Sequence, residues 1–403
     1  MPIADSLKEF SKHLRPAEKK SEGTYGINSH LHLPPNFSAF HSIEQLLDLS
    51  LKENVKVLGT SNYYNFKVYE KFINLAWEKR IFPLLGYETI IYHPLYANQN
   101  ILVNDPKNPG KIYLCGKALT RFLNPDPVSA THLKQICLND EERAKKMIKN
   151  INHIMEMKKI PITLDYDRLA QNLATRYQTP QETIVLQERH LAAGLQEALV
   201  HDAQGQISQS CKILFGIEEE KPWQDKVFLQ NEIRTHFFKI GKAAYVEETF
   251  ISLENALELT EHLGGLPVYP ILGDGAPVMS EFEKSPEQLA QFLKSMNIWG
   301  VEFIPIRNSR KMLRTYVEAL HSAGFFVTAG TEHNTLTLDP IRPLVEGKYS
   351  IDPDLVNIFF QGTSVLIAHQ IEVAQDRPGL SRFDQIGEFK ELGARYLKQW
   401  VNE

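Results

Sequence analysis

The sequence predicts an α/β protein with a helical insertion, and three observations lead to this prediction. Strand-like and helix-like segments alternate over roughly the first 90 residues, which is typical of parallel strands covered by helices. The same alternation returns after about residue 246. Between about residues 117 and 210 no strong strand candidate is present. We therefore expect an α/β part formed by residues 23–109 and 246–403, interrupted by a mainly helical insertion over residues 110–245.

The expected strands are short apolar runs that end at glycine or polar residues. Runs of this kind, bounded by turn signals, fit strands that are buried on both faces of a sheet. They are expected at residues 25–33, 55–58, 81–88, 266–271, 301–306 and 325–329. Their spacing leaves room for one helix between most successive strands.

Capping signals and helical periodicity indicate where the helices lie. Ser42, followed three residues later by Gln45, is a capping-box pattern that opens one helix. Ser285 and Pro286 place an N-cap and a first-turn proline at the start of another. Within the insertion, apolar residues recur at helical spacing over residues 144–155.

The bulk composition excludes several kinds of partner. The 403 residues are 43% hydrophobic and 23% charged, which is ordinary for a globular protein. A formal net charge of −5 gives no basic surface for long nucleic acid. No apolar run is long enough to span a membrane. We therefore expect neither a membrane nor long nucleic acid as a partner.

The cysteines and the N-terminus predict a cytoplasmic location. Cys115, Cys137 and Cys211 are widely spaced and form no Cys-x-x-Cys motif. Such a set suggests buried thiols in a reducing compartment rather than disulfides. Residues 1–22 form a charged lead-in without the apolar core of a signal peptide. Whether the chain forms a homo-oligomer is left open.

His30 and His32 end the first expected strand, and their spacing directs both imidazoles to one face. Neutral imidazole is the commonest metal ligand, so the pair suits half of a metal site. The alternative is two half-buried histidines that hydrogen-bond to the backbone.

Other strand ends supply further polar side chains. In parallel α/β proteins the active site lies at the carboxyl ends of the strands. The residues expected there are Asn62, Glu88, Tyr269, Arg307, Glu332 and His333. Converging carboxylates and imidazoles can fix a Lewis-acidic ion, which lowers the pKa of a bound water. Alternatively, these residues form a solvated rim.

Several short motifs follow one another between about residues 25 and 336. They are His30-Leu31-His32, Gly86-Tyr87-Glu88, Glu188-Arg189-His190-Leu191-Ala192, Gly264-Gly265-Leu266-Pro267-Val268-Tyr269-Pro270, Gly300-Val301-Glu302-Phe303 and Gly330-Thr331-Glu332-His333-Asn334. In this order they resemble the PHP superfamily, the polymerase and histidinol phosphatase group of metal-dependent phosphoesterases. The resemblance implies a distorted seven-stranded (β/α) barrel with a helical insertion.

The chain also departs from the pattern of that family. Asn62 and Asn100 stand where histidines are expected, Tyr269 replaces another, and Asn334 replaces the last one. An amide oxygen is a poorer ligand than imidazole for zinc-like ions. A full three-metal cluster is therefore not expected.

The resemblance implies a smaller metal site, with one or two divalent ions of zinc, manganese or iron. The ligands it implies are His30, His32, Glu88 and Glu332, with His333 as a further candidate. Glu332 and His190 are the expected catalytic residues.

Substrate-binding roles are expected for Arg189, Arg307, Asn62, Tyr269 and Asn334. The planar guanidinium of Arg307 suits bidentate binding of an oxyanion, and a surface ion pair is its alternative. For Arg189 and His190 the alternative is a surface arginine beside a half-buried histidine.

The function expected from these residues is a metal-dependent, phosphoesterase-like hydrolase. A metal-bound hydroxide would attack a small anionic or phosphorylated metabolite. Two alternatives stay open. One is a sugar-acid isomerase or amidohydrolase-like enzyme on a similar barrel, and the other is a non-catalytic binding protein with a degenerate site.

Overall fold

The computed structural model describes residues 25–402 of the 403-residue chain, apart from residues 37, 203–206 and 336. The chain divides into two compact units. Of the described residues, the α/β unit comprises those up to Leu33, Ala39–His132 and those from Phe250 onward. The helical unit comprises Pro34–Ser38 and Leu133–Thr249. The expected lead-in at residues 1–22 lies outside the described residues.

The strands of the α/β unit lie mainly in two sheets. Their bounds are β1 Gly26–Leu31, β2 Val55–Thr60, β3 Asn62–Tyr63, β4 Phe82–Leu84, β5 Gly86–Tyr92, β6 Lys111–Lys117, β7 Leu266–Ile271, β8 Gly300–Phe303, β9 Phe326–Ala329, β10 Leu344–Val345 and β11 Tyr349–Ser350. One sheet has the order β1-β2-β4 and the other has the order β3-β5-β6-β7-β8-β9. β10 and β11 form a separate antiparallel pair. Because β3 directly follows β2, and β5 directly follows β4, the two main sheets are continuous along the chain.

Within the two main sheets, β6 is the strand that departs from parallel pairing. It runs antiparallel to both β5 and β7, whereas the other neighbouring pairs are parallel. The expectation of parallel strands alone, and of an insertion that begins at residue 110, is therefore wrong. The chain returns from β5 to β6 at one end of the sheet, where the His93 N–H donates to the Gly110 carbonyl (2.8 Å). A return of this kind, without a crossover helix, produces antiparallel pairing.

The first strand lies beside the segment that follows β9. A parallel bridge joins Leu31 to Glu332. The His32 N–H donates to the Glu332 carbonyl, and the Glu332 N–H donates to the His30 carbonyl, both at 2.9 Å. The structure confirms a mixed α/β fold with parallel strands and many helices. The closed seven-stranded barrel stays a prediction.

Serine N-caps begin several helices of the α/β unit. The helices are α2 Ile43–Lys52, α3 Tyr69–Glu78, α4 Pro94–Asn98, α10 Leu253–His262, α11 Pro286–Ser295, α12 Arg310–Ser322, α13 Pro353–Ala374 and α14 Ile386–Asn402, with 3₁₀ turns η3 Gly273–Gly275, η4 Pro305–Arg307 and η5 Phe383–Gln385. Ser42, Ser252, Ser285 and Ser309 each accept a hydrogen bond from the backbone N–H three residues later. Each satisfies a donor that the helix itself cannot pair, and the predicted starts at Ser42 and Ser285 are confirmed.

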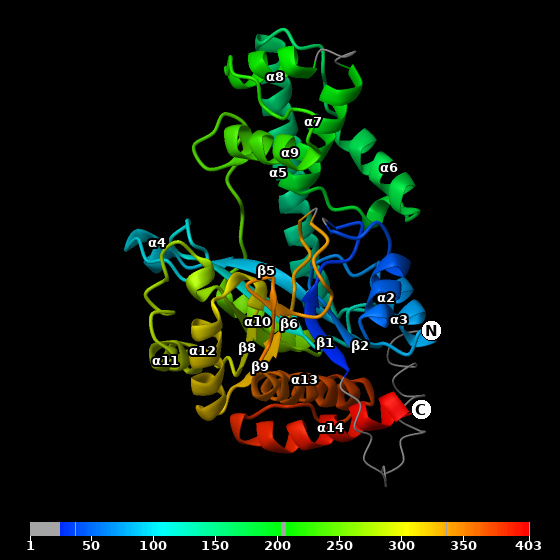
Figure 1. Ribbon diagram of the computed structural model, residues 1–403, viewed down its shortest axis with the longest axis vertical. Helices are drawn as coiled ribbons and strands as arrows, with labels where there is room; N and C mark the ends of the chain where they lie inside the picture. The colour runs from blue at the N-terminus through cyan, green and yellow to red at the C-terminus, as the bar shows by residue number, and fades with distance from the viewer. Residues whose placement is uncertain (1–24, 37, 203–206, 336, 403) are drawn as a thin grey trace. The chain divides into compact units, whose positions relative to one another are not determined.

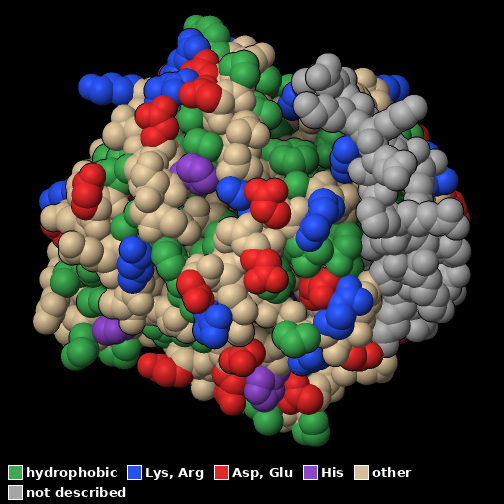
Figure 2. Space-filling model, turned by 90° about the horizontal axis from the view of Figure 1, so that it is seen from below, with side chains coloured by type: hydrophobic (Ala, Val, Ile, Leu, Met, Phe, Trp, Pro, Cys, Tyr) green, Lys and Arg blue, Asp and Glu red, His purple; other side chains and the backbone are tan. Residues whose placement is uncertain are grey.

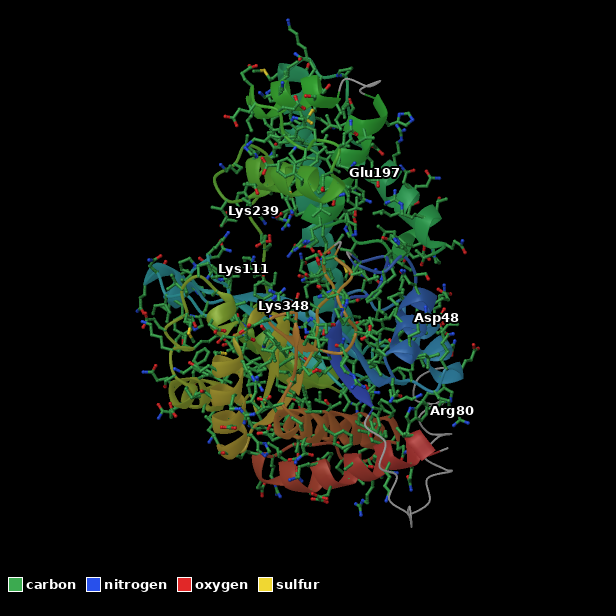
Figure 3. The ribbon with its side chains drawn as sticks, viewed as in Figure 1. Asp48, Arg80, Lys111, Glu197, Lys239 and Lys348 are labelled. Atoms are coloured by element: carbon green, nitrogen blue, oxygen red, sulfur yellow. The ribbon has the colours of Figure 1, made fainter. Side chains whose placement is uncertain are left out.

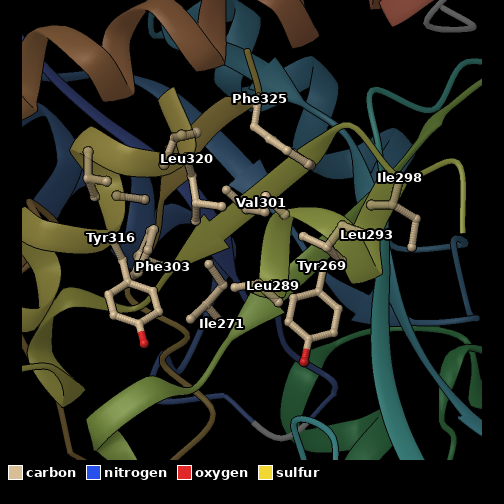
Figure 4. Close-up of a cluster of buried hydrophobic side chains, with 14 of the residues drawn as sticks. Tyr269, Ile271, Leu289, Leu293, Ile298, Val301, Phe303, Tyr316, Leu320 and Phe325 are labelled. Carbon is tan, nitrogen blue, oxygen red and sulfur yellow. The ribbon is translucent and has the colours of Figure 1, made fainter. Parts of the chain in front are cut away.

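A buried apolar cluster holds β7 and β8 against α11 and α12 (Figure 4). Val301 and Phe303 of β8 belong to it together with Leu293 and Leu320, and all four are 0% exposed. Burying each such side chain contributes about 1.5–3 kcal/mol to stability. Because strand side chains alternate between faces, this packing directs Glu302 to the opposite face of β8.

The helical unit has an apolar core of its own. Its elements are α5 Pro127–Met157, which starts shortly before the unit, α6 Tyr166–Tyr177, η1 Gln181–Thr183, α7 Glu188–Asp202, α8 Ile207–Phe215, α9 Lys226–Ile233 and the π-helical turn η2 Arg234–Phe238. Met147 and Ile151 of α5 lie in one buried cluster with Leu191 and Leu195 of α7 and with Trp223. Among the described residues of this unit no strand is present.

The surface carries charges of both signs. On the face drawn in Figure 2, acidic and basic side chains are interspersed rather than gathered by sign. This distribution agrees with the formal net charge of −5. Among the helices in the described part of the chain, none has the length and apolar character needed to cross a membrane.

The contact between α13 and α14, which lie side by side in Figure 1, gives a first prediction. A methyl group on Gly393 would lie 1.8 Å from the Ser364 carbonyl oxygen, whereas one on Gly387 would meet nothing within 4 Å. Gly393→Ala should lower the free energy of unfolding by about 1–3 kcal/mol through overpacking. Gly387→Ala, in the same helix, should be neutral or stabilise by up to about 1 kcal/mol. Urea unfolding measures both, and equal stability of the two variants would contradict the packing.

Candidate metal centre

β1 brings two imidazoles to one place in the α/β unit. His30 lies within β1 and His32 directly follows it. Both residues are only 1% exposed, and their ring centroids are 5.4 Å apart. The hydrogen bonds between this strand and the backbone of Glu332 fix the positions from which both side chains project.

Glu88 of β5 brings a carboxylate to the same point. Its Oε2 atom lies 3.4 Å from His32 Nε2 and 3.9 Å from His30 Nε2. Glu88 is 6% exposed, so all three side chains are buried. The strand pairing links the two positions, because β1 pairs with β2, and β3, which directly follows β2, pairs with β5.

The three converging atoms lack hydrogen-bond partners. Within the described part of the chain, His30 Nε2, His32 Nε2 and Glu88 Oε2 are buried and unpaired. Leaving one buried polar atom unsatisfied costs about 1–3 kcal/mol. All three lie within 4.8 Å of one another. Two imidazole nitrogens and one carboxylate oxygen are a donor set that zinc and related divalent metals accept, so these residues fit a divalent cation.

The second ring nitrogen of His30, Nδ1, is held by a buried carboxylate. His30 Nδ1 lies 2.6 Å from Glu302 Oε2. Glu302 also accepts hydrogen bonds from Ser29 Oγ (2.7 Å) and lies 2.9 Å from Lys117 Nζ. Burial raises the pKa of Glu302, but the Lys117 ammonium and the contact with His30 lower it by more, to about 2. The carboxylate therefore stays ionised behind the ring.

Cys115 lies behind the same histidine. Its Sγ atom is 4.0 Å from His30 Nδ1, and it forms a second group of possible metal ligands with His30 and Glu302. Burial raises the pKa of the Cys115 thiol well above its usual value, and the nearby carboxylates add to this effect. Because His30 Nδ1 and Glu302 Oε2 of this group already pair with each other, the group around Glu88 is the better candidate.

Glu332 stands next to the centre but is engaged elsewhere. Its Oε1 accepts a hydrogen bond from Arg307 Nη1 (2.8 Å), and its Oε2 accepts one from Asn334 Nδ2. Burial raises the pKa of Glu332, but Arg307, then His30 and His32, lower it to about 2. The carboxylate is not among the atoms that converge with Glu88.

Two other predicted residues, His333 and Asn62, make contacts of a structural kind. His333 Nδ1 lies 2.6 Å from Thr331 Oγ1, and its Nε2 donates to the Asp339 carbonyl (2.8 Å), so its ring is used away from the centre. Asn62 Oδ1 accepts from the Leu33 N–H (2.7 Å) and so holds the chain just after His32.

Tyr269 lies in the apolar cluster of Figure 4. Its hydroxyl donates to Glu283 Oε1 at 3.0 Å. Burial raises the pKa of Glu283 to about 7. This pair joins β7 to the segment before α11, and no metal-ligand group of the described residues includes it.

Arg189 and His190 belong to the helical unit. His190 is buried, its Nε2 donates to the Pro35 carbonyl (3.2 Å), and its Nδ1 accepts from the Gln187 N–H (3.0 Å). Burial lowers the pKa of His190 to about 4, so the ring is neutral at pH 7. The substrate and catalytic roles of this pair stay predictions.

Two functional residues are missing from the sequence-based set. Glu302 was expected only as part of a strand motif, and Lys117 was not singled out. The signal available for Lys117 was its place just after the apolar run Ile112–Cys115 and Gly116. A lysine beside a buried run needs a partner, because lysine is rarely buried without one.

Comparison by sequence gives no assignment, because the chain matches no family model and no curated protein. Comparison by structure finds an amidohydrolase from Chromobacterium violaceum with bound sulfate and no metal. It has 15% identity and a TM-score of 0.52, over 83% of this chain and 96% of that one. A second is a proposed metal-dependent phosphoesterase from Bifidobacterium adolescentis, with 13% identity and a TM-score of 0.53 over 86% of this chain and 98% of that one. The chain shares their fold.

The buried His190 gives a prediction for the pH dependence of stability. Its pKa is about 4 in the folded chain against about 6.5 for an unfolded one. The unfolded state therefore binds more protons between these values, so stability is lost as pH falls from about 6.5 to 4. The contribution should approach about 1.4 kcal/mol per pH unit.

Urea unfolding at several pH values tests this expectation. His190→Gln should flatten the pH dependence between pH 4 and 6.5. His153→Gln is the matched control in the same unit, because the His153 side chain is 70% exposed. A His190→Gln variant with the wild-type pH dependence would show that burial of this ring does not destabilise its charged form.

Proposed function

We propose that this protein is a metal-dependent hydrolase of the PHP type that acts on a small anionic or phosphorylated metabolite. The observation that carries the proposal is the convergence of His30 Nε2, His32 Nε2 and Glu88 Oε2, all buried and all without hydrogen-bond partners. The fold shared with an amidohydrolase and a proposed metal-dependent phosphoesterase supports it. The bridge between Leu31 and Glu332 supports a ring of strands of the PHP kind.

His30, His32 and Glu88 would hold the divalent ion. Two neutral nitrogens and one carboxylate leave open positions in a four- to six-coordinate ion, as catalytic sites require. When bound, such an ion supplies Lewis acidity and makes water easier to deprotonate. Glu302 keeps the His30 ring in place through its contact with Nδ1.

Arg307 would bind the substrate, and Glu332 would accept a proton. The side chain of Arg307 is 38% exposed, so its guanidinium can meet an anionic group that enters from solvent. Glu332, held by Arg307 and Asn334, would accept a proton from the attacking water. An anion on Arg307 would compete with Glu332 for the same guanidinium and so release its carboxylate.

An amide is the second substrate class that we consider. The similar structure from Chromobacterium violaceum is an amidohydrolase, and the same donor set can polarise an amide carbonyl. Phosphate release and amide cleavage measured on parallel substrate panels distinguish the two classes.

The direct test is the metal dependence of turnover. Phosphate release should be lost after chelation and should return when zinc or manganese is added. The bound metal should also raise the melting temperature, because it binds the folded chain alone. A purified protein that takes up no divalent metal, or one whose turnover survives full chelation, would contradict the proposal.

Glu332→Gln tests the proton-transfer role. Turnover should fall by about 100-fold or more, while the melting temperature changes little. Glu372→Gln is the matched control, because Glu372 and Glu332 are both 12% exposed and both pair with an arginine. Turnover of the Glu332→Gln variant close to that of Glu372→Gln would remove Glu332 from the mechanism.

A further inference from the structure

We propose that Lys117 is a positioning residue that limits the metal centre to a single ion. It does so by holding Glu302 as the hydrogen-bond partner of His30, which keeps this carboxylate from serving as a metal ligand. The inference rests on the proposed metal binding and concerns the number of ions and the orientation of His30.

Lys117 is the last residue of β6, and its side chain is 0% exposed. Room for it depends on Gly86 of the neighbouring strand. A Cβ atom there would lie 2.9 Å from Lys117 Cδ and 2.6 Å from the Thr60 carbonyl oxygen. A lysine this deeply buried needs partners for its charge and for its three N–H donors.

All three donors of Lys117 have partners in the α/β unit. Its Nζ atom donates to the Ser29 carbonyl (2.8 Å) and to Ser61 Oγ (2.5 Å), and it lies 2.9 Å from Glu302 Oε2. These partners come from β1, from the link between β2 and β3, and from β8. One side chain therefore joins three strands directly behind His30.

Glu302 in turn has hydrogen-bond partners on both of its carboxylate oxygens. Its Oε1 accepts from Ser29 Oγ (2.7 Å) and Thr328 Oγ1 (3.3 Å), and its Oε2 faces Lys117 Nζ and His30 Nδ1. A carboxylate offers about four lone-pair positions. Four donor groups face these positions, although the Ser29 and Thr328 hydroxyls also face the Ala329 and Val301 carbonyls. Both oxygens of Glu302 are therefore engaged in hydrogen bonds.

This commitment fixes which nitrogen of His30 can bind metal. Because Glu302 Oε2 is an acceptor, Nδ1 carries the proton and donates, which leaves the lone pair on Nε2. Nε2 is the atom that faces Glu88. A carboxylate behind the ring is the arrangement that orients metal-binding histidines and raises their basicity.

The same contacts exclude a second ion at His30, Cys115 and Glu302, the other possible ligand group. An ion there would need the Nδ1 lone pair and a Glu302 oxygen, which are both engaged. It would also lie beside the Lys117 ammonium on the same carboxylate, where like charges repel in a medium of low dielectric constant. These contacts leave room for one ion, bound by His30, His32 and Glu88.

Zinc loading of the metal-stripped full-length protein tests the inference. Zinc per chain is measured by mass spectrometry, and zinc affinity by competition with a chelating dye. The wild type should bind one zinc ion. Lys117→Met should weaken binding by about 10- to 100-fold, the usual effect of losing a residue that supports a ligand.

Lys111→Met is the matched control, because Lys111 opens the same strand, is also buried, and lies near Asp105 rather than Glu302 (labelled in Figure 3). It sits roughly 20 Å along the strand from Lys117. Zinc affinity of this variant should equal that of the wild type, and melting curves show whether each variant is folded.

The outcomes distinguish a failure of this inference from a failure of the proposed function. A wild type that binds no zinc overturns both. A folded Lys117→Met variant that binds one zinc ion with wild-type affinity overturns the role of Lys117 and leaves the proposed function standing. A wild type that binds two zinc ions per chain also overturns the role of Lys117 alone. If Lys117→Met does not fold, ¹⁵N spectra of the metal-free wild type decide: His30 protonated on Nδ1 supports the inference, and protonation on Nε2 overturns it.

Discussion

The buried contact between Lys117 and Glu302 is the interaction on which the candidate centre depends. Both side chains are 0% exposed, and each would be an uncompensated charge without the other. Removing one partner of such a pair usually costs about 3–5 kcal/mol. Through the Ser29 carbonyl and hydroxyl, the pair also fixes the strand position next to His30. The contacts of Lys117 and Glu302 thus hold His30 in place, although its Nε2 atom has no hydrogen-bond partner.

The chain after β9 provides the second constraint. Glu332 and His333 adopt left-handed backbone conformations, with φ of 65° and 53°, which side chains other than glycine adopt at some cost. The bridge to Leu31 and the His333 contacts with Thr331 and Asp339 compensate for that cost. The bend lets consecutive residues serve different purposes: Glu332 meets Arg307 and Asn334, while His333 anchors the loop.

Local patterns in the sequence predicted part of this arrangement. The two-residue period of a strand places His30 and His32 on one face, and the Gly86-Tyr87-Glu88 motif supplies the carboxylate. Glu88 lies inside β5, however, and not at the end of a strand as expected. The patterns could not reveal β6, because its apolar run is short, is bounded by lysines and pairs antiparallel. The partnership of Lys117 with Glu302 depends on strands far apart in the sequence. Likewise, only the tertiary structure shows that Tyr269 pairs with Glu283 in the apolar core.

Anomalous X-ray diffraction at the zinc absorption edge, on crystals of the zinc-loaded protein, tests the central claim most directly. The account predicts one strong peak per chain within about 2.0–2.2 Å of His30 Nε2, His32 Nε2 and a Glu88 carboxylate oxygen. A zinc-loaded crystal without a peak at these three atoms, or with its peak at Cys115 and Glu302, would contradict it.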